Sequence, residues 1–293
     1  MLSRYEYLIP QNMDEALSAL SLKKEGIQII AGGTDLVIRL REDSGPVGTL
    51  LDLRMIPELG QIEKKDDKMI IGSMVNFDEI ANSPQIQEFF PALSEAARSV
   101  GSPQIRNTAT MGGNIVNAAP AADSVPTLMA LQARLRLVST EGQREVSLEE
   151  FLVGLNETIL RDGEILHSIE IPFAGNGTMA FAKIGRRKAL AIARINVAVS
   201  MKLDAGNVIT ECRVALGAVG KTAYRSKVTE EYLTGKILED AIIAEAMQLI
   251  SDEVRTRLGS RPTAPYKSAL AGAVLKRALC SMIESKNGGT CNE

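Results

Sequence analysis

The apolar and polar positions of the chain predict a first small unit built from strands and helices in alternation. Asn12 and Glu15 indicate a helix start, with Asn12 as the N-cap and Glu15 as its capping-box partner. The apolar run 27–31 predicts a buried strand, and residues 36–40 predict a short helix directly after it. Residues 50–53 predict a second strand. Strand, turn, helix and strand therefore follow one another as one small lobe.

Two further units follow in the same pattern. The second begins with a strand at 69–72 and a helix from about Asp78, and continues with helices at 91–100 and 124–131 and strands at 135–139 and 165–171. Residues 172–177 contain successive turn formers and predict a linker. Beyond it, residues 179–184, 195–203 and 208–218 predict three strands, with a hairpin at 204–207. Helices at 239–255 and 266–284 complete the chain.

Two segments with paired glycines interrupt this pattern. Gly32-Gly33 ends the first strand and precedes Thr34-Asp35, and Gly112-Gly113 lies in Thr110-Met111-Gly112-Gly113-Asn114. Glycine lets backbone amides come close to a bulky anion, because no Cβ intervenes. Successive N–H groups in one concavity bind phosphate without any lysine or arginine. A pair of glycines alone is also an ordinary turn, so the prediction of a shared diphosphate site depends on the two segments together.

The sequences around these glycines resemble one family. AGGTDL and QIRNTATMGGNIVNAAPAAD are similar to the FAD-binding subunit of the molybdenum hydroxylases, the group of xanthine, carbon monoxide and nicotinate dehydrogenases. The resemblance extends along the whole chain. It implies an α+β fold of the vanillyl-alcohol-oxidase (PCMH) type, with FAD-binding lobes at 1–57 and 58–173. An α/β C-terminal domain at 178–293, with a three-stranded antiparallel sheet, is expected to cover the flavin.

The resemblance also implies which residues bind FAD. Two segments are expected to contact the cofactor, the second of them also near the flavin ring: Gln28, Ile29, Ile30, Ala31, Gly32, Gly33, Thr34 and Asp35, and then Thr110, Met111, Gly112, Gly113 and Asn114. Asp123 matches an acidic residue on the ribose side, although it also suits the N-cap of the helix at 124–131. Ile165 matches a contact with the adenine half, although the same side chain suits a core.

Lys183 matches the family's lysine close to the isoalloxazine, where a cation favours the reduced anionic flavin and raises its reduction potential. A lysine by itself is more often a solvated surface group. Arg186-Arg187-Lys188 matches a segment that gates the flavin in relatives, and its alternative is a solvated basic loop. Some relatives carry an aromatic residue a few positions on, whereas this chain has Leu190 and Ile192. We expect one of these two to cover the ring instead.

The family implies an electron-transfer role without substrate hydroxylation. Electrons would pass from a large molybdopterin-binding subunit through the [2Fe–2S] clusters of a small subunit to FAD here, and then to NAD⁺ or another acceptor. A self-contained flavin reductase and a non-catalytic flavin-binding or assembly protein remain open alternatives. No catalytic acid–base pair or metal-ligand cluster is expected from the sequence. The substrate pocket of the complex is expected to lie on another subunit.

Composition limits the other classes of function. The net charge of −3 and the 4% content of aromatic residues argue against nucleic-acid binding. No segment approaches 18 uninterrupted apolar residues, so no membrane insertion is expected. Three scattered cysteines predict neither an iron–sulfur cluster nor a zinc site, and they suggest a reducing, cytoplasmic location. His167, the single histidine, is expected to be structural. The segment 217–222 only approximates a Walker A loop, because Ala215 stands where the first glycine belongs.

Overall fold

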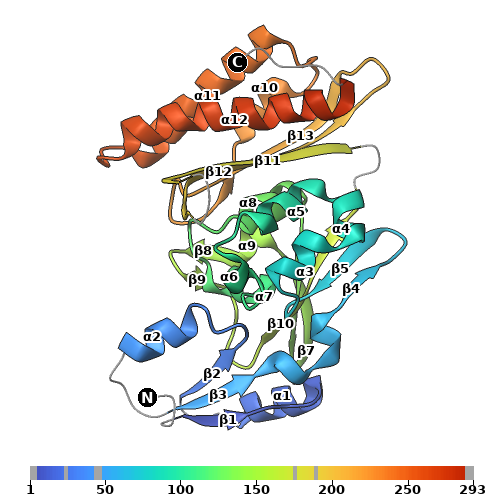
Figure 1. Ribbon diagram of the computed structural model, residues 1–293, viewed down its shortest axis with the longest axis vertical. Helices are drawn as coiled ribbons and strands as arrows, with labels where there is room; N and C mark the ends of the chain where they lie inside the picture. Colours follow the sequence, from blue (N-terminus) through green and yellow to red (C-terminus); the bar gives the residue numbers. More distant parts are fainter. Residues whose placement is uncertain (1–4, 23–25, 43–47, 174–176, 188–190, 288–293) are drawn as a thin grey trace. The chain divides into compact units, whose positions relative to one another are not determined.

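The chain divides into two units, and each unit is assembled from three separate stretches. The computed structural model describes residues 5–22, 26–42, 48–173, 177–187 and 191–287. The first unit comprises Met1–Ile80, Ser102–Ala118 and Ala133–Pro172, and the second comprises Ala81–Gly101, Ala119–Gln132 and Phe173–Glu293. Most helices and strands of both units are labelled in Figure 1.

The first unit begins with a three-stranded parallel sheet of order β1-β3-β2, formed by Glu6–Leu8, Thr49–Asp52 and Ile27–Ile30. Neighbouring residues of a strand point to opposite faces. Leu51 accordingly packs with Ala16 and Leu17 of helix α1 (Met13–Ser21), whereas Leu50 packs with Leu40 of helix α2 (Leu36–Glu42). One helix therefore covers each face of the small sheet.

The predicted start of α1 is confirmed. Asn12 Oδ1 accepts a 2.9 Å hydrogen bond from the backbone N–H of Glu15, and the Glu15 carboxylate accepts from Asn12 Nδ2 at 2.9 Å. Glu15 also accepts from the backbone N–H of Gln11 at 2.8 Å. Side chains thereby satisfy amides at the helix start that have no partner within the helix.

A five-stranded antiparallel sheet forms the larger part of the first unit. Its order is β4-β5-β10-β6-β7, with bounds Ile62–Lys64, Lys68–Gly72, Ile165–Pro172, Arg134–Ser139 and Gly142–Ser147. Around it lie α3 (Phe77–Asn82), α6 (Pro103–Arg106), α7 (Met111–Asn117), α9 (Leu148–Phe151), the pair β8 (Leu152–Gly154) and β9 (Glu157–Thr158), and 3₁₀ turns at Leu53–Met55 and Pro57–Gly60. Helix α7 contacts the central strand β10.

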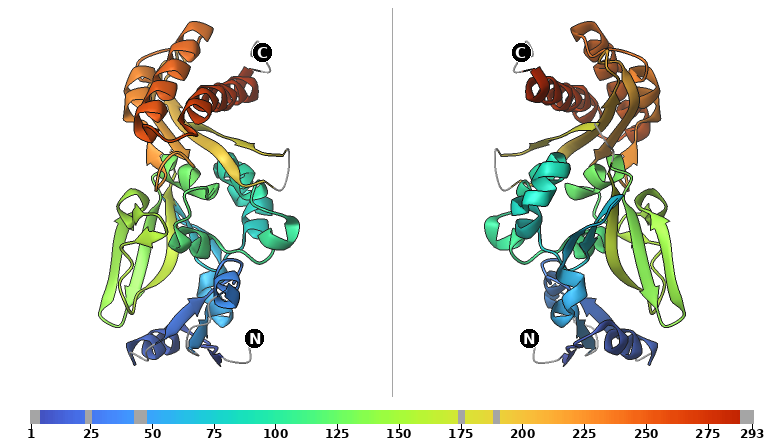
Figure 2. Two further views of the ribbon diagram at one scale, coloured as in Figure 1. Left: turned by 90° about the vertical axis from the view of Figure 1, so that its left-hand side faces the viewer. Right: turned by 90° about the vertical axis from the view of Figure 1, so that its right-hand side faces the viewer.

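The second unit has three layers, with a four-stranded antiparallel sheet between two layers of helices. The strands, in order, are β11 (Gly177–Gly185), β12 (Ala193–Leu203), β13 (Ile209–Gly217) and β14 (Tyr224–Arg225). Helices α11 (Asp240–Leu258) and α12 (Ala264–Asn287) pack on one face, as Figure 2 shows. Helices α5 (Pro91–Arg98) and α8 (Ser124–Ala130) contact the strands from the other. Helices α4 (Pro84–Phe89) and α10 (Lys227–Leu233) complete the unit.

Most of the predicted elements are present, with some corrections. The fold class is confirmed, but the C-terminal sheet has a fourth strand, β14. This strand has only two residues, which is too short for a pattern to predict. The sequence pattern also does not predict strands β1, β4, β7, β8 and β9 or helices α4, α6, α7, α9 and α10. The core of the predicted linker, residues 174–176, lies outside the described residues. The proposed lobe boundaries at 57 and 173 stay predictions. No helix in the described ranges is long and apolar enough to cross a membrane.

Candidate functional site

The two glycine segments meet within the first unit. A Cβ placed on Gly32 would lie 1.9 Å from the carbonyl oxygen of Thr108, two residues before the Thr110–Asn114 segment. A Cβ placed on Gly113 would lie 3.6 Å from the Cβ of Ala31. Contacts this close require glycine at position 32, because a backbone oxygen cannot move aside as a flexible side chain can. The expected convergence of two segments about eighty residues apart in sequence is therefore present.

The second glycine segment is the start of a helix, which corrects its interpretation as a turn. Helix α7 begins at Met111, with Thr110 as its N-cap, and Thr110 Oγ1 accepts from the N–H of Gly113 at 3.1 Å. The N–H of Gly112 donates to the carbonyl of Ser73 at 2.9 Å, and a Cβ on Gly112 would lie 2.5 Å from that of Ser73. Gly112 therefore serves close packing, and its amide already has a protein acceptor.

The unused backbone donors lie on the first segment. Within the described ranges, no protein acceptor takes the N–H of Gly32, Gly33 or Thr34. Gly33 has a φ of +70°, a left-handed conformation that costs glycine little. Three consecutive free donors, one of them in a left-handed conformation, suit an anion. The N–H groups of Gly32, Gly33 and Thr34 therefore suit the diphosphate of FAD. The residues at the start of α7 instead pack against the protein and support the turn at Gly32-Gly33.

A side-chain contact joins the two segments. Asn117 Nδ2, at the end of α7, donates to Asp35 Oδ1 at 3.1 Å, and Thr34 Oγ1 lies 3.3 Å from Asp35 Oδ2. Asn117 is itself held at its carbonyl oxygen, which accepts from Asn156 Nδ2 at 2.7 Å. Sequence reasoning did not select Asn117, although an asparagine near a helix end was an available signal.

The second unit contains a separate buried charge centre. Lys183 on β11 forms an ion pair with Asp123 Oδ2, and its ammonium also donates to the carbonyl of Ser99 at 3.0 Å. Burial raises the pKa of the Asp123 carboxyl, and the adjacent Lys183 ammonium acts against that rise. The Lys183 side chain is 12% exposed, so it is a largely buried, paired cation and not a solvated surface group.

Asp123 does not cap helix α8, which corrects one expectation. The residue stands at the N-cap position, but its backbone is helical (φ −79°, ψ −33°) and its side chain makes no capping hydrogen bond. The carboxylate instead accepts from Lys183 and from Asn196 Nδ2, the latter at 2.9 Å. Its expected contact with the ribose side of FAD stays a prediction.

Other candidate residues are placed less directly. Ile165 is 1% exposed and packs in a core with Leu51 and Ile56, so an adenine contact there would involve its backbone. Residues 188–190, which include Lys188 and Leu190, lie outside the described ranges. Ile192 is 81% exposed, so it is available to cover a ligand, and the gating hypothesis stays a prediction. The remaining predicted contacts, Gln28 to Ile30, belong to strand β2.

Among the residues with a described placement, His167 and Cys212 show no catalytic arrangement. His167 is half-buried, its Nδ1 lies 3.1 Å from Ser168 Oγ, and burial lowers its pKa. Burial raises the pKa of the free Cys212 thiol to about 12, which leaves it unreactive. Among the described residues, no three His, Cys, Asp or Glu side chains are grouped to hold a metal.

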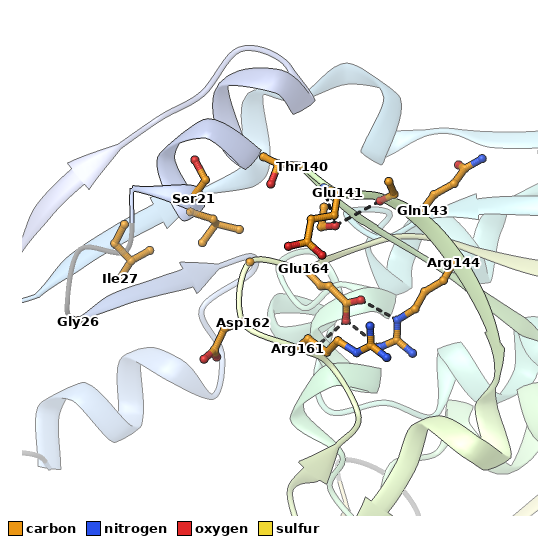
Figure 3. A pocket seen from close by; sticks show the side chains of 14 residues that line it. Ser21, Gly26, Ile27, Thr140, Glu141, Gln143, Arg144, Arg161, Asp162 and Glu164 are labelled. Atoms are coloured by element: carbon orange, nitrogen blue, oxygen red, sulfur yellow. Dashed lines mark hydrogen bonds and ion pairs between the residues drawn. The ribbon is translucent and has the colours of Figure 1, made fainter.

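A cavity of about 990 Å³ opens in the first unit. The end of α1, the start of β2, the β6–β7 turn and residues 161–164 line it, as Figure 3 shows. Arg144 donates to both carboxylate oxygens of Glu164, at 2.6 and 2.8 Å, and lowers the pKa of that carboxyl. None of the residues expected to contact FAD is among the described residues that line this cavity.

Comparison with known families defines the class of the chain. The family described as "FAD binding domain in molybdopterin dehydrogenase" matches residues 3–174. The family described as "CO dehydrogenase flavoprotein C-terminal domain" matches residues 180–282. The chain is thus a two-part flavoprotein, with FAD as its cofactor.

Individual relatives define the family of the chain more narrowly. The chain is 32% identical to the nicotinate dehydrogenase FAD-subunit of Eubacterium barkeri over 99% of each protein. It is also 32% identical to the carbon monoxide dehydrogenase medium chain of Hydrogenophaga pseudoflava, over 94% of this chain and 96% of that one. A solved carbon monoxide dehydrogenase from that organism superposes with a TM-score of 0.87 at 30% identity, covering 96% and 97% of the two chains. This chain belongs to the FAD-binding subunits of the molybdenum hydroxylase family.

Proposed function

We propose that this chain is the electron-transfer subunit of a molybdenum hydroxylase complex. It takes electrons from [2Fe–2S] clusters on a small partner subunit, downstream of a large molybdopterin-binding subunit, and passes them to NAD⁺ or another acceptor. The observation that carries the proposal is the convergence of Gly32 on Thr108, beside three free backbone donors. The names of the relatives support the division of labour, because they are single FAD-subunits or medium chains of larger enzymes.

The residues of this chain bind and orient; the redox chemistry belongs to the cofactor. Bound FAD supplies an acceptor that handles electrons singly or in pairs. Gly32, Gly33 and Thr34 offer N–H donors to the diphosphate, and Asp35 is held beside them by Asn117. Lys183 supplies a largely buried cation, and its ammonium would stabilise negative charge on the ring of a reduced flavin bound close to it.

Purification of the full chain tests the proposal. We expect one FAD per chain and reduction of that flavin by NADH or by a reduced iron–sulfur partner, with no turnover of an organic substrate. Independent substrate turnover would instead support a self-contained flavin reductase. Stoichiometric FAD that neither donor reduces would support a non-catalytic flavin-binding protein. A colourless chain that takes up no added FAD would overturn all three functions.

Reconstitution decides the direction of electron flow. The chain is mixed with a large and a small subunit of a relative, and flavin reduction is followed after that enzyme's substrate is added. We expect flavin reduction only when both partners are present. Adding NAD⁺, ferredoxin, a quinone or oxygen to the reduced mixture then identifies the acceptor.

A further inference from the structure

Three residues lie side by side across the sheet of the second unit. Asn196 on β12 is paired in register with Lys183 on β11 and with Gly217 on β13. Their neighbours Ala182, Ile195 and Leu216 belong to the core under α11 and α12. Because side chains alternate along a strand, Lys183 and Asn196 point to the opposite face, toward α8.

Asn196 makes contacts that fix the position of Asp123. Its Nδ2 donates to Asp123 Oδ1 at 2.9 Å and to the carbonyl of Ala122 at 3.2 Å. The second carboxylate oxygen, Oδ2, is thereby left to Lys183. Asn196 is 0% exposed, so water does not compete for these bonds. One amide group therefore holds both the carboxylate and the backbone next to it.

Gly217 provides the space in which Asn196 sits. A Cβ on Gly217 would lie 2.2 Å from Asn196 Oδ1 and 2.9 Å from Pro126 Cγ. Asn196 Oδ1 is buried without a hydrogen-bond partner among the described residues. A buried amide oxygen without a partner is unfavourable, so the packing that keeps it there acts to aim the Nδ2 end at Asp123.

We propose that Asn196 is a positioning residue for Lys183, acting through Asp123 and seated by Gly217. It holds the carboxylate in one orientation, and the carboxylate holds the ammonium in one place. The consequence for the flavin rests on the proposed function: a fixed cation gives a fixed contribution to the reduction potential, whereas a mobile one does not. The hydrogen bonds of Asn196 also help Asp123 stay ionised against the effect of burial on its pKa.

The first experiment measures how readily the Lys183 ammonium reacts in the full chain, and it does not depend on bound cofactor. The rate at which acetic anhydride acylates Lys183 is followed by peptide mass spectrometry in Asn196→Leu, Asn196→Ala and Gly217→Ala. We expect the rate to rise about tenfold in each, as loss of one hydrogen bond to a charged group implies. Ser200→Ala is the matched control, because Ser200 lies on the same face of β12 and is 3% exposed. Circular dichroism checks that each variant is folded. If Asn196→Leu is unfolded, the acylation rate of Asn196→Ala decides.

The second experiment measures the midpoint potential of FAD bound to the same variants. We expect the midpoint potential of the Asn196 and Gly217 variants to shift in the same direction as that of Lys183→Met. The potential of Ser200→Ala should not shift. Unchanged acylation in folded Asn196→Ala and Gly217→Ala overturns the positioning role. Faster acylation with an unmoved potential overturns the link to the flavin. A chain that binds no FAD contradicts the proposed function instead, and the acylation rates still decide the role of Asn196.

Discussion

Asn117 and Asp35 are 82 residues apart in sequence, yet their side chains are joined by a hydrogen bond of 3.1 Å. The bond connects the end of helix α7 to the residue that follows the free amides of Gly32, Gly33 and Thr34. Because Asn156 holds the carbonyl of Asn117 in turn, at 2.7 Å, three segments of the first unit are tied together at this point.

Removing this tie should weaken FAD binding. In Asn117→Ala the turn after β2 loses a polar contact that contributes about 0.5–1.5 kcal/mol, so the Kd for FAD should rise about two- to tenfold. Isothermal titration of the FAD-free chain measures the effect. Asn107→Ala is the control, because Asn107 is an exposed residue at the end of α6. Equal Kd values for the two variants would contradict a role for the tie.

Gly32→Ala should damage both stability and cofactor binding. The new methyl group would lie 1.9 Å from the carbonyl oxygen of Thr108, so the two glycine segments must separate. Forced overpacking of this kind costs about 3 kcal/mol. Thermal unfolding and FAD titration measure the two losses. Gly60→Ala, where a Cβ meets nothing within 4 Å, should change neither. A Gly32→Ala chain that still binds FAD as wild type does would disprove the convergence.

Asp123 and Lys183 should show strong coupling in a double-mutant cycle. Either Asp123→Asn or Lys183→Met alone leaves a buried charge without its partner, which destabilises by about 3 kcal/mol. The double variant should lose much less than the sum of the two, because no orphan charge remains. Urea unfolding of the four proteins gives the coupling energy. Additive effects would mean that the pair is screened by solvent.

His167 should make the free energy of unfolding depend on pH below neutrality. Burial lowers its pKa from an ordinary value of 6.5, so the unfolded chain binds a proton at a higher pH than the folded chain. The stability that neutral His167 contributes is therefore present above pH 6.5 and is lost as pH falls through the lower, folded-state pKa. Urea unfolding between pH 7.5 and pH 5 measures this. The free energy of unfolding should fall more steeply with decreasing pH in wild type than in His167→Gln. Parallel curves would show that the imidazole is solvated.

The sequence predicted what depends on local patterns. The cap at Asn12, strand β2 and the long helices α11 and α12 follow from residue type and apolar spacing, and all are present. The hairpin after β12 is also present, where Asp204 Oδ1 accepts from the N–H groups of Gly206 and Val208 at 2.8 and 2.9 Å. Strand β14, with two residues, has no periodicity to detect.

The roles that local patterns did not predict depend on contacts with residues distant along the chain. Gly112 reads as a turn residue, but its use is set by Ser73, which approaches only after folding. Asp123 fits a helix cap by position, and only the tertiary placement of Lys183 and Asn196 directs its carboxylate elsewhere. Asn196 could have been noticed, because it is the one polar residue among the apolar positions of 195–199.

The interleaving of the two units along the chain has a practical consequence for dissecting the protein. A fragment ending at Pro172 keeps α5 and α8 but deletes the strands against which they pack in the second unit. Apolar side chains that the whole protein buries, including Leu93, Val125 and Leu128, lose that cover. Such a truncation should therefore precipitate when expressed alone, even though the boundary between the two family matches invites a cut there.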